Sequence, residues 1–154
     1  MIKIRVTPGP GCTLTGRRFG KLRVTEPSTG PTQAVTTVRT GLVGNPRLQL
    51  VNSSSTLDVA QLPAPSIDVS SSADGTLAAV TFGTPVSPSN LLRIYSLQSG
   101  VVQHTVTLPF NNGVVEVARG NFAVVVASGG NPRVVSVNML TGQTQTLNLA
   151  GASV

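Results

Sequence analysis

The side chains of this sequence that could perform acid–base or metal chemistry are few and widely spaced. His104 is the only histidine, and the chain of 154 residues has five acidic side chains. A metal site with two or more histidine ligands is therefore excluded within one chain. His104 lies in a polar run between the apolar residues Val102 and Val106, and we expect it to be an exposed residue on a β-strand. We expect no metal site and no cofactor.

A serine hydrolase triad would need His104 beside Asp58, Asp68 or Asp74. Asp74 is accounted for by an Asp-Gly turn, and no Gly-x-Ser-x-Gly elbow is present to hold a nucleophilic serine. Asp68 and Glu116 take equivalent positions in two copies of an internal repeat, where they would cap loops at strand ends rather than form a catalytic pair. We therefore predict that the protein is not an enzyme and has no catalytic residues.

The glycine-rich segment 9–16 contains the single cysteine, Cys12. This segment lacks the Lys-Ser/Thr ending and the following helix of a phosphate-binding loop. Cys12 lies in a Pro-Gly turn and has no second cysteine to pair with, so we expect an inert thiol. Aromatic residues make up only 3% of the chain and Trp is absent, which argues against a sugar-binding pocket.

The composition is that of a turn-rich β protein. Charged residues make up 10% of the chain, hydrophobic residues make up 40%, and there are 16 Gly and 11 Pro. Between the turns the common residues are Val, Thr, Leu and Ile, which suit a pleated sheet. No stretch of about 12 residues has the apolar spacing of a helix without Gly or Pro. We predict an all-β fold in one domain, or in a small module with an extended arm.

An imperfect repeat of about 45 residues organises the second half of the chain. The aligned segments, in pairs, are 67–69 and 115–117, 75–80 and 120–125, and 92–100 and 134–142. The copies differ in length only where Ser, Gly, Pro and Asn are frequent, as surface loops do. Each copy is one structural unit that cannot bury its own faces, so it must stack on a neighbour.

Each clear copy is predicted to form four short antiparallel strands joined by Gly and Asn turns. The predicted strands are 66–70, 77–82, 91–95 and 101–108 in the first copy and 114–118, 122–127, 133–138 and 143–149 in the second. Residues 32–62 are a candidate for a worn third copy, with strands expected at 34–38, 48–52 and 57–62. The run Ala123–Val126 is apolar at every position, so we expect it to be covered on both sides within a stack of sheets.

Positive charge is concentrated in the first third of the chain. The net charge is +6, and eight of the 11 basic residues precede residue 50, where Glu26 is the one acidic residue. Prolines and glycines separate two predicted strands, 2–7 and 21–25, so residues 1–31 are expected to form an extended basic arm. The candidate contacts to an assembly or an anionic partner are Lys3, Arg5, Arg17, Arg18, Lys21 and Arg23.

Three interpretations of this basic arm remain open. Its charge suits an acidic protein surface or a phosphate backbone. Docking on protein is favoured over nucleic acid, because Phe19 is the one aromatic among these basic residues and stacking platforms use several. The third interpretation is a solvated edge strand, on which Lys and Arg discourage aggregation.

Segments 74–77, 92–100 and 134–142 resemble the blades of WD40-like and YVTN-type β-propeller repeats. Those blades often carry an Asp-Gly turn before the second strand and a hydrophobic-polar-hydrophobic strand followed by Thr/Ser-Gly. The resemblance covers residues 66–150 and implies four-stranded antiparallel sheets. The second copy departs from it, with Arg119-Gly120 in place of Asp-Gly. A closed propeller has about four to eight blades, so copies from other chains complete a ring, the blades pack on a partner, or the sheets form a sandwich.

The expected fold is therefore all-β, with two or three four-stranded blade-like antiparallel sheets, propeller-like or sandwich, after an extended basic N-terminal arm. The expected organisation is an arm at 1–31, a degenerate blade and linker at 32–65, and a two-blade module at 66–154. The chain shows no signal peptide and no run of about 20 apolar residues that would span a membrane. We expect a virion or cytoplasmic location.

By analogy, a small β-rich chain with an extended arm is typical of a virus or bacteriophage particle, as a decoration, connector or tail component. We expect a non-enzymatic structural protein that docks on other protein subunits, as a homo-oligomer or in a particle lattice. The alternative is a propeller-type adaptor or lectin-like binding module completed by homo-oligomerisation.

Overall fold

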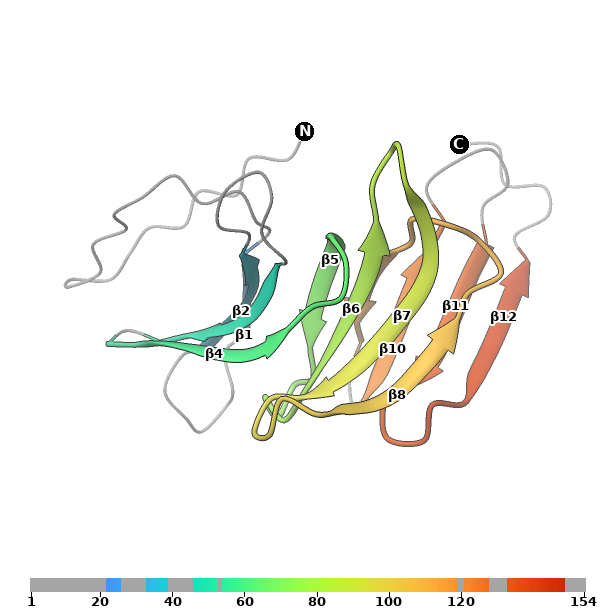
Figure 1. Cartoon of the computed structure of the whole chain (residues 1–154). Helices are drawn as coiled ribbons and strands as arrows, with labels where there is room; N and C mark the ends of the chain where they lie inside the picture. The colour runs from blue at the N-terminus through green and yellow to red at the C-terminus, as the bar shows by residue number, and fades with distance from the viewer. Residues whose placement is uncertain are drawn as a thin grey trace.

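The computed structural model describes residues 22–25, 33–38, 46–52, 54–118, 121–127 and 133–148. These residues form twelve β-strands and no helix, and every pair of neighbouring strands is antiparallel (Figure 1). The predicted all-β class is confirmed.

Three four-stranded sheets follow one another along the chain, and each runs in sequence order. Sheet 1 consists of β1 (Leu22–Thr25), β2 (Gln33–Val38), β3 (Arg47–Val51) and β4 (Thr56–Gln61). Sheet 2 consists of β5 (Ser66–Ser71), β6 (Leu77–Gly83), β7 (Pro88–Ser96) and β8 (Val102–Thr107). Sheet 3 consists of β9 (Val114–Val117), β10 (Phe122–Val126), β11 (Arg133–Asn138) and β12 (Thr144–Asn148).

The strands predicted for residues 66–150 are confirmed to within a few residues, and the worn third copy also forms a sheet. Its first strand is β1, because Leu22 pairs with Thr36 of β2. We had expected this strand in the arm, yet it belongs to sheet 1. The strand expected at residues 2–7 lies outside the described residues.

The repeat is visible in equivalent backbone hydrogen bonds. The N–H of Leu97 donates to the carbonyl of Thr76 at 2.8 Å, and the N–H of Met139 donates to that of Asn121 at 2.7 Å. Each bond ties the end of the third strand to the turn before the second. Sheets 2 and 3 are therefore built on the same local plan.

The register corrects one equivalence that the sequence indicated. Asp68 pairs with Thr81, whereas Val114 pairs with Val126, the repeat equivalent of Thr81. Asp68 is thus equivalent to Val114, and the expected match with Glu116 was wrong. The physical reason is the two-residue period of a strand, since a shift of two positions leaves every side chain on its original face.

Sheet 2 lies between the other two and is covered on both faces. One buried cluster joins it to sheet 1 and includes Leu48, Val80 and Phe82. A second cluster joins it to sheet 3 and includes Ile94 and Val125. Every residue of β6 is buried as a result.

Among the described residues, strand β10 is covered by another sheet on one face only, which corrects the expectation for Ala123–Val126. Ala123 and Val125 are fully buried, whereas Phe122 is 47% exposed and Val126 is 40% exposed. The pattern covered on both sides belongs instead to β6. Sheet 3 is the last described layer, so no other described sheet packs against its second face.

A glycine turn anchors each later sheet to the sheet before it. Gly100 has φ +72°, and a Cβ there would lie 2.0 Å from the carbonyl oxygen of Val59 in β4. Gly142 has φ +73°, and a Cβ there would lie 2.9 Å from Nδ1 of His104 in β8. Both the left-handed backbone and the close approach require glycine, which gives the Ser/Thr-Gly ending of each repeat a physical role.

Candidate functional site

The first strands of sheets 2 and 3, β5 and β9, are joined by side chains rather than by a continuous ladder. The N–H of Val115 donates to Oδ2 of Asp68 at 3.1 Å, and the N–H of Val117 donates to Oγ of Ser70 at 3.0 Å. Both strands are sheet edges, and unpaired edge N–H groups must find acceptors when buried. Side chains of β5 therefore provide hydrogen-bond acceptors for the N–H groups of Val115 and Val117 on the edge of β9.

Asp68 is buried, with 2% of its surface exposed. Its Oδ1 also accepts a hydrogen bond from the backbone N–H of Val69 at 2.9 Å. A carboxylate that accepts backbone N–H bonds is one of the stronger hydrogen-bonding groups inside a protein. These contacts give Asp68 a structural role at the junction of two sheets. They do not involve the loop cap that its sequence position indicated.

The other two aspartates considered for a triad have local partners. Asp58 in β4 forms an ion pair with Arg47 and accepts a hydrogen bond from Gln49, and these contacts, Gln49 first, hold the pKa of Asp58 below its ordinary value. Asp74 accepts a 2.6 Å hydrogen bond from the Ser72 hydroxyl, which is the main cause of its lowered pKa. These contacts tie Asp58 to β3 and stabilise the β5–β6 turn around Asp74.

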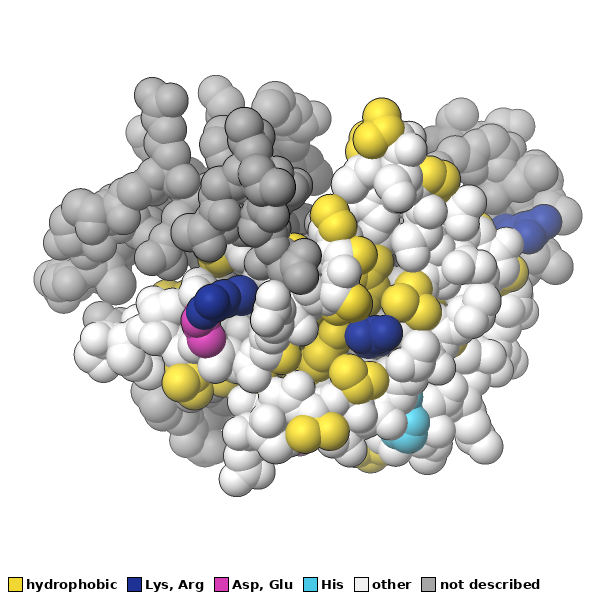
Figure 2. All heavy atoms as spheres, in the orientation of Figure 1, with side chains coloured by type: hydrophobic (Ala, Val, Ile, Leu, Met, Phe, Trp, Pro, Cys, Tyr) yellow, Lys and Arg dark blue, Asp and Glu magenta, His cyan; other side chains and the backbone are white. Residues whose placement is uncertain are grey.

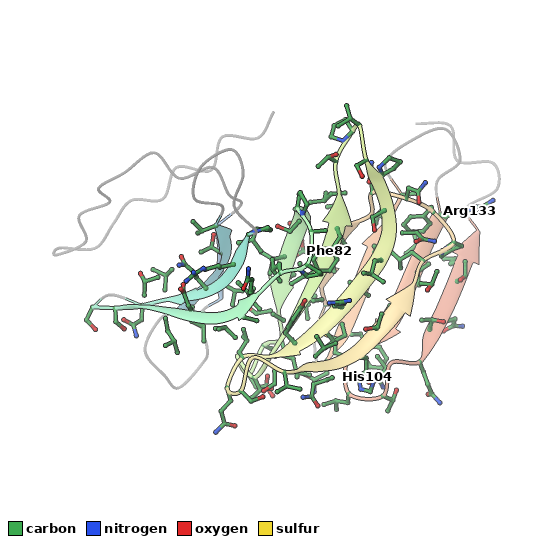
Figure 3. All side chains as sticks on the ribbon, viewed as in Figure 1. Phe82, His104 and Arg133 are labelled. Carbon is green, nitrogen blue, oxygen red and sulfur yellow. The ribbon has the colours of Figure 1, made fainter. Side chains whose placement is uncertain are left out.

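His104 connects sheets 2 and 3. Its Nε2 lies 2.9 Å from the carbonyl oxygen of Leu140, and Figure 3 shows the ring beside the β11–β12 turn. Because a carbonyl only accepts, the ring nitrogen is the donor. His104 lies on strand β8 as expected, but it is half-buried rather than fully exposed. At the opposite end of β11, Arg133 Nη1 donates to the carbonyl of Pro109 at 3.2 Å.

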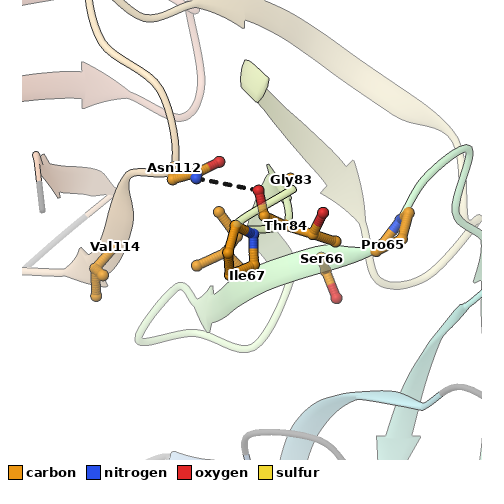
Figure 4. A pocket seen from close by; sticks show the side chains of 8 residues that line it. Pro65, Ser66, Ile67, Gly83, Thr84, Asn112 and Val114 are labelled. Carbon is orange, nitrogen blue, oxygen red and sulfur yellow. Dashed lines mark hydrogen bonds between the residues drawn. The ribbon is translucent and has the colours of Figure 1, made fainter. Parts of the chain in front are cut away.

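An open hollow of about 450 Å³ lies beside the end of β6, the start of β5 and β9 (Figure 4). Asn112 spans it, donating from Nδ2 to the carbonyl of Thr84 at 3.3 Å and accepting from the N–H of Ser89 at 3.2 Å. Asn112 has φ +53°, a conformation that asparagine tolerates better than most residues. Its contacts hold the long β6–β7 hairpin, and none of the described residues that line the hollow has a charged side chain.

The surface that stands out is the face of sheet 3 turned away from sheet 2, which we call the outer face of sheet 3. Four of its apolar side chains are exposed: Val114 by 39%, Phe122 by 47%, Val126 by 40% and Leu147 by 59%. Two more, Val124 and Val134, are half-buried. The polar side chains at the remaining described positions are Glu116, Ser136, Asn138 and Gln145, which the strand pairing places on the same face.

The repeat gives this face a covered counterpart. In sheet 2 the equivalent face packs on sheet 3 and belongs to the second buried cluster. Its apolar members are Leu77, Ala79, Leu92, Ile94 and Val106, and their equivalents in sheet 3 are Phe122, Val124, Val134, Ser136 and Leu147. Four of the five equivalents are apolar. The outer face of sheet 3 therefore has the pattern of a covered sheet face.

A scan against models of known protein families finds no match, and no curated protein matches this chain. Within the described ranges, no group of three or more His, Cys, Asp or Glu side chains could hold a metal ion. The described part of the chain also contains no helix that is long and apolar enough to cross a membrane. Inference about function therefore rests on the geometry of the three sheets.

The basic residues singled out in the arm are not placed by the described part of the chain. Lys3, Arg5, Arg17, Arg18 and Lys21 lie outside it. Arg23 lies in β1, where only its backbone is described. Their contact with an acidic or anionic partner stays a prediction. The apolar run of β10 is the feature of the sequence that indicates the outer face.

Proposed function

We propose that this protein is a non-enzymatic structural subunit that binds neighbouring protein subunits in a larger assembly. The observation that supports the proposal is the outer face of sheet 3, which is apolar at positions whose equivalents in sheet 2 are buried against another sheet. Contiguous exposed apolar surface is uncommon on monomeric proteins and marks sites of interaction.

The way the chain builds itself favours protein over other ligands. Its two buried clusters are both sheet-on-sheet contacts between apolar side chains. A flat, mostly uncharged sheet face offers little to an ionic ligand, because charged groups would lose hydration there without partners. The side visible in Figure 2 also shows few charged side chains among the described residues. Another sheet or a similarly apolar protein surface is the occupant that fits.

A particle component is the most specific form of this proposal. A small β-rich subunit with a basic N-terminal segment suits a virion or bacteriophage decoration, connector or tail component, in which many weak contacts add up. The basic residues from Lys3 to Arg23 would add an electrostatic contact to acidic neighbours. The basis for this step is analogy with other particle components.

The test is sedimentation of the tagged full chain in cells of its natural source. Wild type is expected to sediment with a multi-subunit assembly of fixed composition. Phe122→Glu, which places a charge on the outer face, is expected to sediment as free chain. Val86→Glu is the matched control, because Val86 is 94% exposed in the hairpin between β6 and β7. Sedimentation of the wild type as free chain, or normal assembly of Phe122→Glu, would overturn the proposal.

A further inference from the structure

We propose that the outer face of sheet 3 packs against the same face of a second copy of this chain, giving a two-fold dimer. This inference rests on the proposed function and names the partner of the same surface. It follows from two observations: the repeat equivalence of the faces, and the exposed ion pair at the opposite end of the stack. The size of the face then sets the strength of the contact.

The first observation is continuity with a contact already made within the chain. Sheet 2 uses its Leu77, Leu92 and Val106 positions to pack on a four-stranded sheet of the same repeat. Sheet 3 carries Phe122 and Val134 at the first two of these positions. A surface that reproduces the pattern of a sheet-packing face is suited to receive a sheet, and a second copy supplies one.

The second observation concerns which sheet of the second copy is suited to this contact. A head-to-tail stack would place the outer face of sheet 3 on the far face of sheet 1. That far face carries the exposed Arg47–Asp58 ion pair beside Gln49. Covering an ion pair with apolar side chains removes its hydration without compensation. Pairing two outer faces instead buries apolar side chains against each other.

The position of Glu116 is compatible with this pairing. It is the only charged side chain among the described residues of the outer face, and it lies on β9, the edge strand of sheet 3. The central strands β10 and β11 present Phe122, Val124, Val126 and Val134. The acidic side chain therefore falls at the rim of the contact, where interfaces are polar and hydrated.

The size of the face sets the strength of the contact. The strands of sheet 3 have four to six residues, and spacings of about 4.8 Å between strands and about 3.4 Å per residue give a flat area of roughly 330 Å². A standard stable interface buries about 800 Å² per partner. The dimer should therefore be weak and concentration-dependent. Such a contact becomes strong only when a larger assembly repeats it.

The experiment is sedimentation equilibrium of the purified full chain from about 1 µM to about 1 mM, a range chosen to span weak association. The expected result is monomer at the lowest concentration and mostly dimer at the highest. Val126→Glu should shift the midpoint at least about tenfold upward, because two like charges would face an apolar partner surface. Val86→Glu, the same change on the exposed β6–β7 hairpin, should leave the midpoint unchanged.

A second variant tests the same face in case Val126→Glu fails to fold. Leu147→Ser removes an apolar side chain from β12 that is 59% exposed, and it should weaken the dimer while leaving circular dichroism and melting unchanged. Raising the salt concentration should not dissociate the dimer, since the contact is apolar. Dissociation by salt would assign the association to the basic arm and overturn the inference.

The other outcomes are equally decisive. A monomer at about 1 mM, or a dimer that both outer-face variants leave intact, would overturn the inference. Equal weakening by Val86→Glu would also overturn it, because the association would then not depend on this face. A monomeric purified chain that still enters its native assembly refutes the second copy and leaves the proposed function standing. A purified dimer that never joins an assembly supports the second copy and refutes the proposed function.

Discussion

Oδ2 of Asp68 accepts a hydrogen bond from the backbone N–H of Val115 at 3.1 Å, although the two residues lie in different sheets. Through this bond a side chain on an edge strand of sheet 2 accepts from a backbone N–H on an edge strand of sheet 3. The two strands are joined without merging into one continuous sheet. The sheets remain separate layers and bury their apolar faces against each other. The other face of sheet 3 is not covered by any described strand.

Replacing Asp68 by Ala should destabilise the protein by about 1–3 kcal/mol, because the buried N–H of Val115 would lose its acceptor. Urea unfolding followed by circular dichroism measures this change. Ser70→Ala removes the neighbouring bond to Val117 and should cost less, since its acceptor is neutral. An Asp68→Ala variant within about 0.5 kcal/mol of wild type would show that the bond does not contribute to joining the sheets.

Val125→Asp should abolish soluble folding, at a cost of several kcal/mol, because Val125 is fully buried between sheets 2 and 3. Its neighbour Val126 points to the opposite face and is 40% exposed. Val126→Asp should therefore fold and melt close to wild type. Thermal melting of the soluble fraction compares the two. Wild-type-like melting of Val125→Asp would contradict the stacked-sheet arrangement.

The pKa of Asp74 lies below its ordinary value of 3.8, chiefly because the Ser72 hydroxyl donates to its carboxylate. A carboxyl group with a folded pKa below its unfolded pKa adds stability above the unfolded value, and that stability is lost as pH falls through the folded pKa. Asp74→Asn should therefore reduce stability above about pH 4 and match wild type more closely in stronger acid. Melting temperatures between pH 2 and pH 7 test this. Parallel curves would contradict the role of the charged carboxylate.

Changing Arg17, Arg18, Lys21 and Arg23 to Ser tests the predicted role of the basic arm. If the arm docks electrostatically on neighbours, this variant should keep its melting temperature but assemble less well, and wild-type assembly should weaken as salt rises. Binding to nucleic acid would appear instead as a steeply salt-dependent affinity for any DNA or RNA. Normal assembly at all salt concentrations, with no nucleic acid binding, would leave the arm as a solvated edge.

The strands could be predicted from the sequence because turn residues such as Asp74-Gly75 separate short runs rich in Val, Leu and Ile. The pairing was harder to predict. A shift of two positions keeps the alternation of a strand intact, so the sequence alone aligns Asp68 with Glu116, whereas the strand pairing makes it equivalent to Val114. The sequence also predicts β1 as part of the arm. Its place in sheet 1 depends on pairing with β2, which lies beyond a Pro-rich turn, and that pairing is not visible in the sequence.

The outer face of sheet 3 could be predicted only in part from the sequence. The apolar run of β10 indicated coverage on both faces, but a sequence pattern cannot say which of three similar sheets ends the stack. Phe122 and Leu77 hold equivalent positions, and within the described part of the chain a neighbouring sheet covers Leu77 but not Phe122. The order of layers is a tertiary property, so the open face became apparent from the packing.

The most direct test of the account is thiol alkylation at Val126→Cys, in a Cys12→Ser background, in the native assembly and in the dilute free chain. We expect fast labelling of the free chain, where Val126 is 40% exposed, and strong protection in the assembly. Val86→Cys, on the exposed β6–β7 hairpin, should label at the same rate in both states. Equal labelling of Val126→Cys in the free and assembled states would contradict the claim that the outer face of sheet 3 is a docking surface.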